Sequence, residues 1–240
     1  IPVDLFGLPA RYRLLEQLAK KNNLFVLEDA AQGFGGNIRG RKAGSFGDVA
    51  STSFFPAKPF GGYGDGGAIF TGDDDLASRM KSIRIHGSGA DKYNNIRVGI
   101  NGRLDTLQAA ILLEKLSIFS EEFNYRNEIA KYYISNINSN FRIPYVPNYY
   151  QSSWAQFSLL AKTEEQKLKL FEKMKKFNIP VMVYYKKPLH LQPCFQKLGY
   201  NLGDFPVTER CSNLIFSIPM HPYLEKNQQD TIISVLNDIE

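Results

Sequence analysis

Residues 24–29 read LFVLED, four apolar residues in a row followed by two acidic ones. The run follows Leu14–Ala19, a segment whose apolar residues recur at helical spacing, after four polar residues. A continuously apolar strand that follows a helix is typical of a parallel sheet covered on both faces. Ligands of such sheets bind at the carboxyl ends of the strands, which is where Asp29 is expected.

More strands and a helix follow. Residues 49–55 (VASTSFF) and residues 68–71 (AIFT) are rich in β-forming residues and predict two strands. Asp73 can cap a helix that begins directly after the second strand. The alternation of helices and strands predicts an α/β fold.

A long helix is predicted where Asp105 and Gln108 have the spacing of a capping box. The Ala/Leu/Ile/Glu-rich run after them continues, with at most one break, to about Asn136. We expect this helix to cross between a large domain over residues 1–118 and a small one over residues 119–240.

The second domain is predicted to be a small α/β layer. Residues 154–161 (WAQFSLLA) and 179–185 (IPVMVYY) predict strands, and Thr163 with Gln166 predicts the capped start of a helix between them. Three side chains of that helix are expected to face inward: Phe171, Met174 and Phe177.

The composition excludes several classes of protein. With 240 residues, of which 43% are hydrophobic, the chain can bury a core and is not expected to be disordered. The net charge of +5 is spread along the chain, which gives little reason to expect nucleic acid. Cys194 and Cys211 fit no disulfide framework and no metal site, which favours the cytoplasm. No apolar run approaches the roughly 20 residues that span a bilayer, so no membrane association is expected.

One lysine stands in an unusual setting, in residues 53–68 (SFFPAKPFGGYGDGGA). Pro56 and Pro59 hold Lys58 on a stiff, non-helical loop, and the neighbouring phenylalanines offer partial desolvation. Desolvation favours the neutral form of a lysine that imine formation requires. The alternative is a surface lysine beside a turn. A phosphate loop is not expected, because no Gly-Lys-Ser/Thr and no helix follow the glycines directly.

Three further motifs accompany this lysine: EDAAQ at residues 28–32, Ser53 five residues before Lys58, and GINGRLDTLQAAIL at residues 99–112. With them the chain resembles the sugar-nucleotide aminotransferases of the DegT/StrS type, pyridoxal-phosphate enzymes of fold-type I. The resemblance implies a mixed, mostly parallel sheet flanked by helices, with residues 1–118 as the remainder of the cofactor-binding domain. It extends to PLHLQPCFQKLGY and GDFPVTER near the carboxyl end.

The resemblance assigns roles to individual residues. Lys58 matches the lysine that binds pyridoxal 5′-phosphate covalently, and Asp29 matches the aspartate that pairs with the protonated pyridine nitrogen. Gln32 matches a residue near the phenolic oxygen, and Ser53 matches a donor to the phosphate. Asn101 matches a residue that reaches the phosphate in the neighbouring subunit, which implies a homodimer with shared active sites. Each residue other than Lys58 could, taken singly, also be an ordinary hydrogen-bonding group at a strand end or in a loop.

Candidate substrate contacts are Arg103 and the pair Tyr184-Tyr185. The family commonly has a His-Tyr pair at this place, so tyrosine replaces histidine here, and Tyr184 could instead pack. Lys186 stands where proline is usual in the family.

The implied reaction is transamination of a keto sugar on a nucleoside diphosphate, with glutamate as the amino donor. SIPMHPYL at residues 217–224 leans toward UDP-linked 3- or 4-keto sugars derived from N-acetylhexosamine. Such amino sugars enter surface glycans, lipopolysaccharide among them. The alternatives are a binding or regulatory member of the fold, or a sugar dehydratase, which carries histidine in place of the lysine. Because the chain begins with Ile1 and the family is longer at its amino end, a fragment with weak cofactor binding is also expected.

Overall fold

The structure is a computed structural model that describes residues 1–91 and 93–239; Lys92 and Glu240, the last residue of the predicted C-terminal domain, lie outside them. Two compact units are present. The first comprises Ile1–Phe123 and Val146–Ala155, and the second comprises Asn124–Tyr145 and Gln156–Glu240. The domain boundary after residue 118 stays a prediction.

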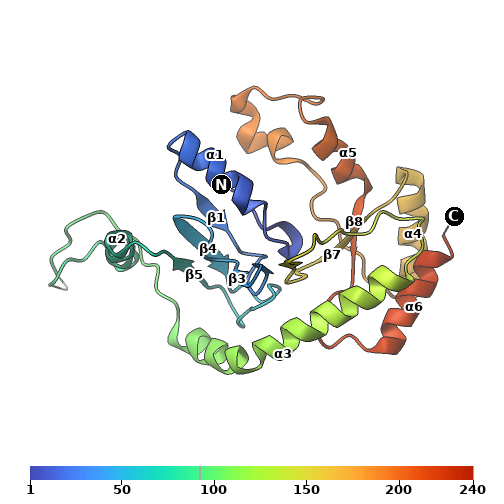
Figure 1. Cartoon of the computed structure of the whole chain (residues 1–240), viewed down its shortest axis with the longest axis horizontal. Helices are drawn as coiled ribbons and strands as arrows, with labels where there is room; N and C mark the ends of the chain where they lie inside the picture. The colour runs from blue at the N-terminus through green and yellow to red at the C-terminus, as the bar shows by residue number, and fades with distance from the viewer. Residues whose placement is uncertain (92, 240) are drawn as a thin grey trace. The chain divides into compact units, whose positions relative to one another are not determined.

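The principal sheet of the first unit has three strands in the order β1-β4-β5 (Figure 1). Strands β1 and β4 are parallel, with Asp29 opposite Ser51, and β5 is antiparallel to β4. The backbone of Val3 forms one further parallel bridge to Asp29. The elements concerned are α1 (Tyr12–Lys21), β1 (Leu27–Asp29), β4 (Val49–Ser53) and β5 (Gly67–Phe70).

A second small sheet explains why residues 146–155 belong to the first unit. Strands β3 (Arg41–Lys42), β2 (Asn37–Ile38) and β6 (Tyr150–Gln151) pair antiparallel in that order. The side-chain amide of Asn37 donates to the side-chain oxygen of Gln151 across it. Pairing with β2 therefore returns this segment to the first unit.

The two helices after β5 begin where the sequence predicts. Helix α2 (Asp74–Arg84) starts with the Asp73 carboxylate accepting from the backbone N–H of Leu76. Helix α3 (Thr106–Asn136) runs for 31 residues as one helix. The prediction of a capping box at its start needs correction, because the Gln108 side-chain oxygen accepts from the backbone N–H of Tyr63 instead.

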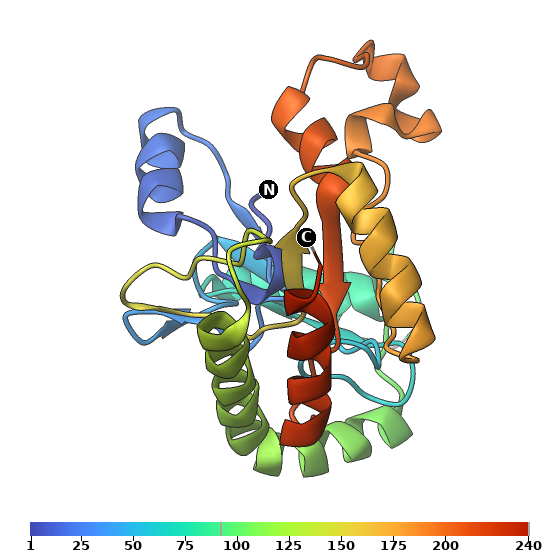
Figure 2. The same cartoon turned by 90° about the vertical axis from the view of Figure 1, so that its right-hand side faces the viewer.

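In the second unit, β7 (Phe157–Leu160) pairs antiparallel with β8 (Ile215–Ile218). Figure 2 shows this pair together with helices α4 and α6, which contact each other. Thr163 caps α4 as predicted, accepting at its hydroxyl from the backbone N–H of Gln166. The remaining elements are α4 (Glu164–Lys176), α5 (Pro206–Leu214), α6 (Lys226–Asn237) and the 3-10 helices Leu5–Gly7, Leu189–Leu191 and Pro193–Leu198.

Two predictions for this unit are wrong. Phe177 lies just beyond the last turn of α4 and is 54% exposed, whereas Met174 one turn earlier is buried as expected. Residues 179–185 do not form a strand and make only a single bridge, between Met182 and Ser217. Pro180 interrupts the segment, since proline has no N–H to donate to a ladder.

None of the described helices combines the length and the apolar character needed to cross a bilayer.

Candidate functional site

The site is built around the edge at which β1 and β4 end. Because these strands are parallel and Asp29 lies opposite Ser51, both chains leave the sheet at the same edge. Ser53 is the last residue of β4, and Lys58 lies in the turn that follows. The structure therefore brings Asp29, Ser53 and Lys58 to one edge of the sheet, which we call the Asp29–Lys58 edge.

The loop that carries Lys58 is closed by hydrogen bonds at its base. The N–H of Phe54 donates to the carbonyl of Gly66 at 2.8 Å, and the N–H of Gly62 donates to the carbonyl of Phe54 at 2.7 Å. The N–H of Lys58 itself donates to Phe55 at 2.9 Å. These hydrogen bonds fix the backbone of Lys58. Because Lys58 is only half-buried, its side chain keeps access to the surface.

The glycines after Lys58 are explained by close backbone packing. A Cβ on Gly61 would lie 2.6 Å from the carbonyl oxygen of Phe55, and one on Gly67 would lie 2.6 Å from that of Thr52. Neither site could accept a side chain without a shift of the backbone. The glycine cluster thus serves the turn into β5, in agreement with the sequence-based interpretation.

The other candidates on this edge make local hydrogen bonds. Asp29 accepts at Oδ1 from the N–H of Ala31 at 3.0 Å, and Ser53 accepts at Oγ from the N–H of Phe55 at 3.2 Å. Gln32 is buried, and its Oε1 accepts from the N–H of Phe6. These bonds hold the three side chains against the neighbouring backbone, as is usual for polar residues at strand ends and in loops.

Asn101 and Arg103 lie elsewhere in the first unit. Asn101 forms a bridge with Ile85 at the end of α2, and the next residue, Gly102, donates to the carbonyl of Arg84 at 2.9 Å. Asn101 and Arg103 are both exposed, and no contact given for the described residues joins them to the Asp29–Lys58 edge.

Tyr184 and Tyr185 belong to the second unit. Their rings meet edge to face with centroids 6.0 Å apart, and Tyr185 is 56% exposed. A role in substrate binding stays a prediction for both.

A buried acidic pair, Asp4 and Glu28, lies next to Asp29, and no sequence pattern predicts it. The backbone N–H of Asp4 donates to the carbonyl of Asp29 at 3.0 Å, and the side chains of Asp4 and Glu28 are both fully buried. Glu28 accepts from the N–H groups of Gly44 and Phe46 at 2.6 and 2.8 Å. Its carboxylate is therefore well satisfied by neutral donors.

Asp4 is bound on one side only. Its Oδ1 accepts from the hydroxyl of Tyr12 at 2.8 Å and from the N–H of Ala10 at 3.0 Å, while Oδ2 has no donor among the described residues. Burial, and after it the neighbouring Glu28, raises the pKa of Asp4 from 3.8 to about 7. Burial and Asp4 likewise raise the pKa of Tyr12, which keeps the phenol a donor. A proton held on Oδ2 relieves the repulsion between the two acids.

We expect this pair to make stability depend on pH. The folded-state pKa of Asp4 is raised, so the folded chain binds more protons than the unfolded chain between about pH 4 and pH 7. The stabilisation is complete below pH 4 and is lost as the pH rises to about 7, at up to about 1.4 kcal/mol per pH unit. Urea unfolding at several pH values measures this slope.

Asp4→Asn, which mimics the protonated carboxyl, should flatten the curve in this interval. Asp75→Asn, on the exposed first turn of α2, is the control and should keep the original slope. An unchanged slope in Asp4→Asn would show that folding does not raise the pKa of Asp4.

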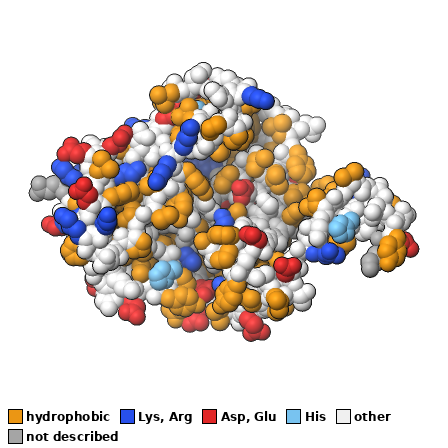
Figure 3. All heavy atoms as spheres, turned by 180° about the vertical axis from the view of Figure 1, so that it is seen from behind, with side chains coloured by type: hydrophobic (Ala, Val, Ile, Leu, Met, Phe, Trp, Pro, Cys, Tyr) orange, Lys and Arg blue, Asp and Glu red, His pale blue; other side chains and the backbone are white. Residues whose placement is uncertain are grey.

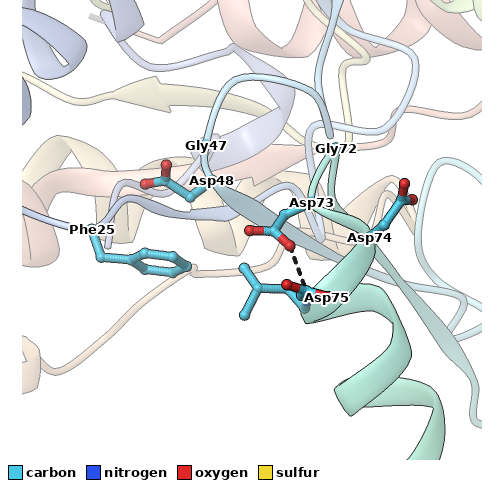
Figure 4. Close-up of a pocket in the computed structure, with 8 residues that line it drawn as sticks. Phe25, Gly47, Asp48, Gly72, Asp73, Asp74 and Asp75 are labelled. Carbon is cyan, nitrogen blue, oxygen red and sulfur yellow. Dashed lines mark hydrogen bonds between the residues drawn. The ribbon is translucent and has the colours of Figure 1, made fainter.

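The structure also has a hollow lined by four aspartates, shown in Figure 4. Gly47 and Asp48 precede β4, and Gly72 and Asp73 follow the antiparallel β5, so the hollow lies at the opposite edge of the sheet from Lys58. Asp48 accepts from the N–H of Val26, and Asp73 caps α2. Among the described residues, no cluster of three or more Asp, Glu, His or Cys side chains is arranged to hold a metal ion. Because it lies at the opposite edge of the sheet from Lys58, this hollow is not the candidate site.

The sequence of the chain is similar to those of known aminotransferases. The model of the DegT/DnrJ/EryC1/StrS aminotransferase family matches residues 1–237. A Pseudomonas aeruginosa protein named UDP-2-acetamido-2-deoxy-3-oxo-D-glucuronate aminotransferase is 39% identical over 239 residues, which is 99% of this chain and 65% of that protein.

Solved structures agree with this match. The crystal structure of a DegT DnrJ EryC1 StrS aminotransferase from Brucella abortus has 45% identity and a TM-score of 0.92, over 98% of this chain and 62% of that one. The structure of ntda from Bacillus subtilis with bound cofactor PMP has 28% identity and a TM-score of 0.86, over 98% of this chain and 55% of that one. The predicted fold class is thereby confirmed. The chain spans less than two thirds of the length of each of these three proteins.

Proposed function

The chain belongs to the DegT/DnrJ/EryC1/StrS aminotransferase family, and on that premise we propose that it binds pyridoxal 5′-phosphate and aminates a nucleotide-linked keto sugar. The observation that carries the proposal is the Asp29–Lys58 edge. There a half-buried lysine on a closed loop and the carboxylate of Asp29 come to the same end of two parallel strands. That is where an α/β sheet binds its ligand. The cofactor bound to the Bacillus subtilis relative supports the choice of cofactor.

The chemistry of the donor set fits this cofactor. Lys58 offers an amine for the aldehyde carbon, Asp29 offers a carboxylate for the protonated pyridine nitrogen, and Ser53 offers a hydroxyl for the phosphate. When bound, pyridoxal phosphate supplies the electron sink for breaking the C–H bond at the carbon that carries the amino group.

The side chains of this chain have separate tasks in the proposed reaction. Lys58 would hold the cofactor through a covalent bond to its Nζ, and when that bond is open the free amine would be the group that takes up and returns a proton. Asp29 keeps the proton on the pyridine nitrogen. Because Oε1 of Gln32 is engaged by the N–H of Phe6, the Nε2 amide is the group of Gln32 that would donate to the phenolic oxygen.

The proposed sugar substrate is UDP-linked, with an N-acetyl group and a 3-keto carbon. The name of the Pseudomonas aeruginosa relative supports this class of substrate, and SIPMHPYL at residues 217–224 favours UDP-linked keto sugars derived from N-acetylhexosamine, with the keto group at carbon 3 or 4. Glutamate is the proposed amino donor. Arg103, Tyr184 and Tyr185 are the proposed substrate contacts, and surface-glycan synthesis is the proposed use of the product.

We propose a homodimer in which Asn101 contacts the cofactor phosphate held by the partner subunit. The segment around Asn101 exposes apolar side chains, with Val98 95% exposed and Ile100 63% exposed. Figure 3 shows hydrophobic side chains at the surface of the lobe that carries α2. An exposed apolar surface beside Asn101 supports an interface at this place.

The first test is the absorbance spectrum of the chain with pyridoxal phosphate, before and after borohydride, followed by peptide mapping. We expect a new absorbance band with the cofactor, and we expect the cofactor to be found covalently attached to Lys58 after reduction. The same spectrum should be recorded for a chain extended to the length of its relatives. A band in the extended chain alone would mean that these 240 residues bind the cofactor weakly, and a band in neither chain would mean that the protein does not bind it. If neither chain gives a band, the alternative of a binding member of the fold replaces the proposal.

A further inference from the structure

The loop that carries Lys58 has a second anchor, which comes from α3. The backbone N–H of Tyr63, in the short turn between Gly62 and Gly66 that we call the loop tip, donates to Oε1 of Gln108 at 2.8 Å. Gln108 lies in the first turn of α3 and is separated from Tyr63 by 45 positions in the sequence. This contact ties the tip of the loop to a rigid element.

Two glycines on either side of Tyr63 make room for Gln108. A Cβ on Gly62 would lie 2.9 Å from Oε1 of Gln108, and one on Gly64 would lie 3.0 Å from its Nε2. Both distances are shorter than ordinary van der Waals contact, so the amide of Gln108 lies directly against the backbone of the loop. A side chain at either glycine would push the Gln108 amide out of its present position.

Gln108 belongs to a row of side chains on one face of α3. Leu112, Lys115 and Phe119 follow it at helical spacing. Leu112 reaches Gly62, with its Cδ2 3.8 Å from the Cβ position there, and the ammonium of Lys115 lies 5.9 Å from the centre of the Tyr63 ring.

The row ends in the core of the first unit. The ring of Phe119 lies 5.2 Å from the ring of Phe60, which is buried and follows Lys58 by two residues. Phe60 also contacts Phe34 and Phe54. The loop is therefore held at its base by Phe54 and Gly66, in the middle by Phe60, and at its tip by Gln108.

We propose that Gln108 is a positioning residue, which fixes the loop tip on α3 and so holds Lys58 in the orientation its chemistry requires. The proposal rests on the proposed function in its last step only. The hydrogen bond at the tip holds the backbone directly after Gly62, the residue that closes the Lys58 loop on Phe54, and so it fixes that closing point on α3. Small displacements of a reacting group lower reaction rates strongly, which gives such an anchor its value.

The test compares two variants at this position. Gln108→Leu keeps the size of the side chain and removes the acceptor, whereas Gln108→Glu keeps an acceptor oxygen at the same reach. Gln166→Leu is the matched control, because Gln166 also accepts from a backbone N–H, that of Lys162 at 2.9 Å, but lies in the second unit. Gln108→Asn, which shortens the reach, takes the place of the leucine variant if that variant does not fold.

Two readouts are needed. Amide hydrogen exchange at Gly62 and Tyr63 reports the loop, and it should be about fivefold faster in Gln108→Leu, as expected for the loss of one ordinary hydrogen bond. The rate and pH profile of borohydride trapping of pyridoxal phosphate on Lys58 should change in the same variant. Gln108→Glu should restore both, and Gln166→Leu should alter neither.

The outcomes separate the two proposals. Faster exchange with an unchanged trapping profile would reduce Gln108 to a purely structural role and overturn the inference. If neither the wild-type chain nor the chain extended to the length of its relatives traps pyridoxal phosphate, the proposed function fails, and the hold on Lys58 is then read from its rate of reductive methylation by formaldehyde and cyanoborohydride. A higher rate in Gln108→Leu than in wild type supports the inference, and an equal rate overturns it.

Discussion

Replacing Lys58 with alanine is expected to abolish covalent trapping of pyridoxal phosphate and to lower transamination on the order of 10³-fold or more. The residue lies in the turn after β4 on a loop closed at its base, and alanine at this position leaves the backbone hydrogen bond from residue 58 to Phe55 in place. The loss would therefore be chemical and would not come from unfolding. Absorbance with the cofactor, borohydride reduction and peptide mapping measure it.

Lys20→Ala is a suitable control, because Lys20 is an exposed lysine in the last turn of α1. It should trap as much cofactor on Lys58 as the unchanged chain does. Retention of the full transamination rate by Lys58→Ala would remove the assignment of this lysine, whatever the spectrum of the cofactor.

Asp29→Asn should separate cofactor binding from catalysis. Asparagine is nearly the same size and can still accept from the N–H of Ala31, so the end of β1 should keep its shape. A neutral amide does not stabilise a proton on the pyridine nitrogen, and the electron sink is weakened. We expect trapping on Lys58 to persist, and the transamination rate to fall at least about a hundredfold.

The matched control is Asp48→Asn. Asp48 also accepts from a backbone N–H, that of Val26 at 2.7 Å, but it precedes β4 and so lies at the opposite edge of the sheet. A similar loss of rate in both variants would mean that general damage to the sheet, and not the charge of Asp29, causes the effect. Single-turnover rates with a keto-sugar nucleotide, measured at the same amount of bound cofactor in each variant, would distinguish damage to the sheet from loss of the Asp29 charge.

Local elements follow closely from the sequence. The caps at Asp73 and Thr163 were predicted, and both are formed by bonds between residues three apart in the chain. The strand at β4 and the turn at Lys58 were predicted from β-forming residues, prolines and glycines. In each case the residues that decide the structure are neighbours in the chain, and their preferences act without the rest of the fold.

Predictions that depended on distant partners were less successful. Phe177 continues the apolar spacing of α4 but lies past its end, where helical spacing no longer determines which side is buried. Residues 179–185 have the composition of a strand, yet only Met182 finds a partner, in Ser217. Strand formation requires a neighbouring edge, and composition does not reveal whether that edge is present.

The sequence by itself determined the family, the α/β fold class and the residues assigned to the Asp29–Lys58 edge, because these depend on short motifs. Only the tertiary structure revealed the acid pair of Asp4 and Glu28, and the hold of Gln108 on the loop tip. Both join residues more than 20 positions apart. A buried carboxyl or amide is defined by the partners that replace water around it, and those partners are brought together only when the chain has folded.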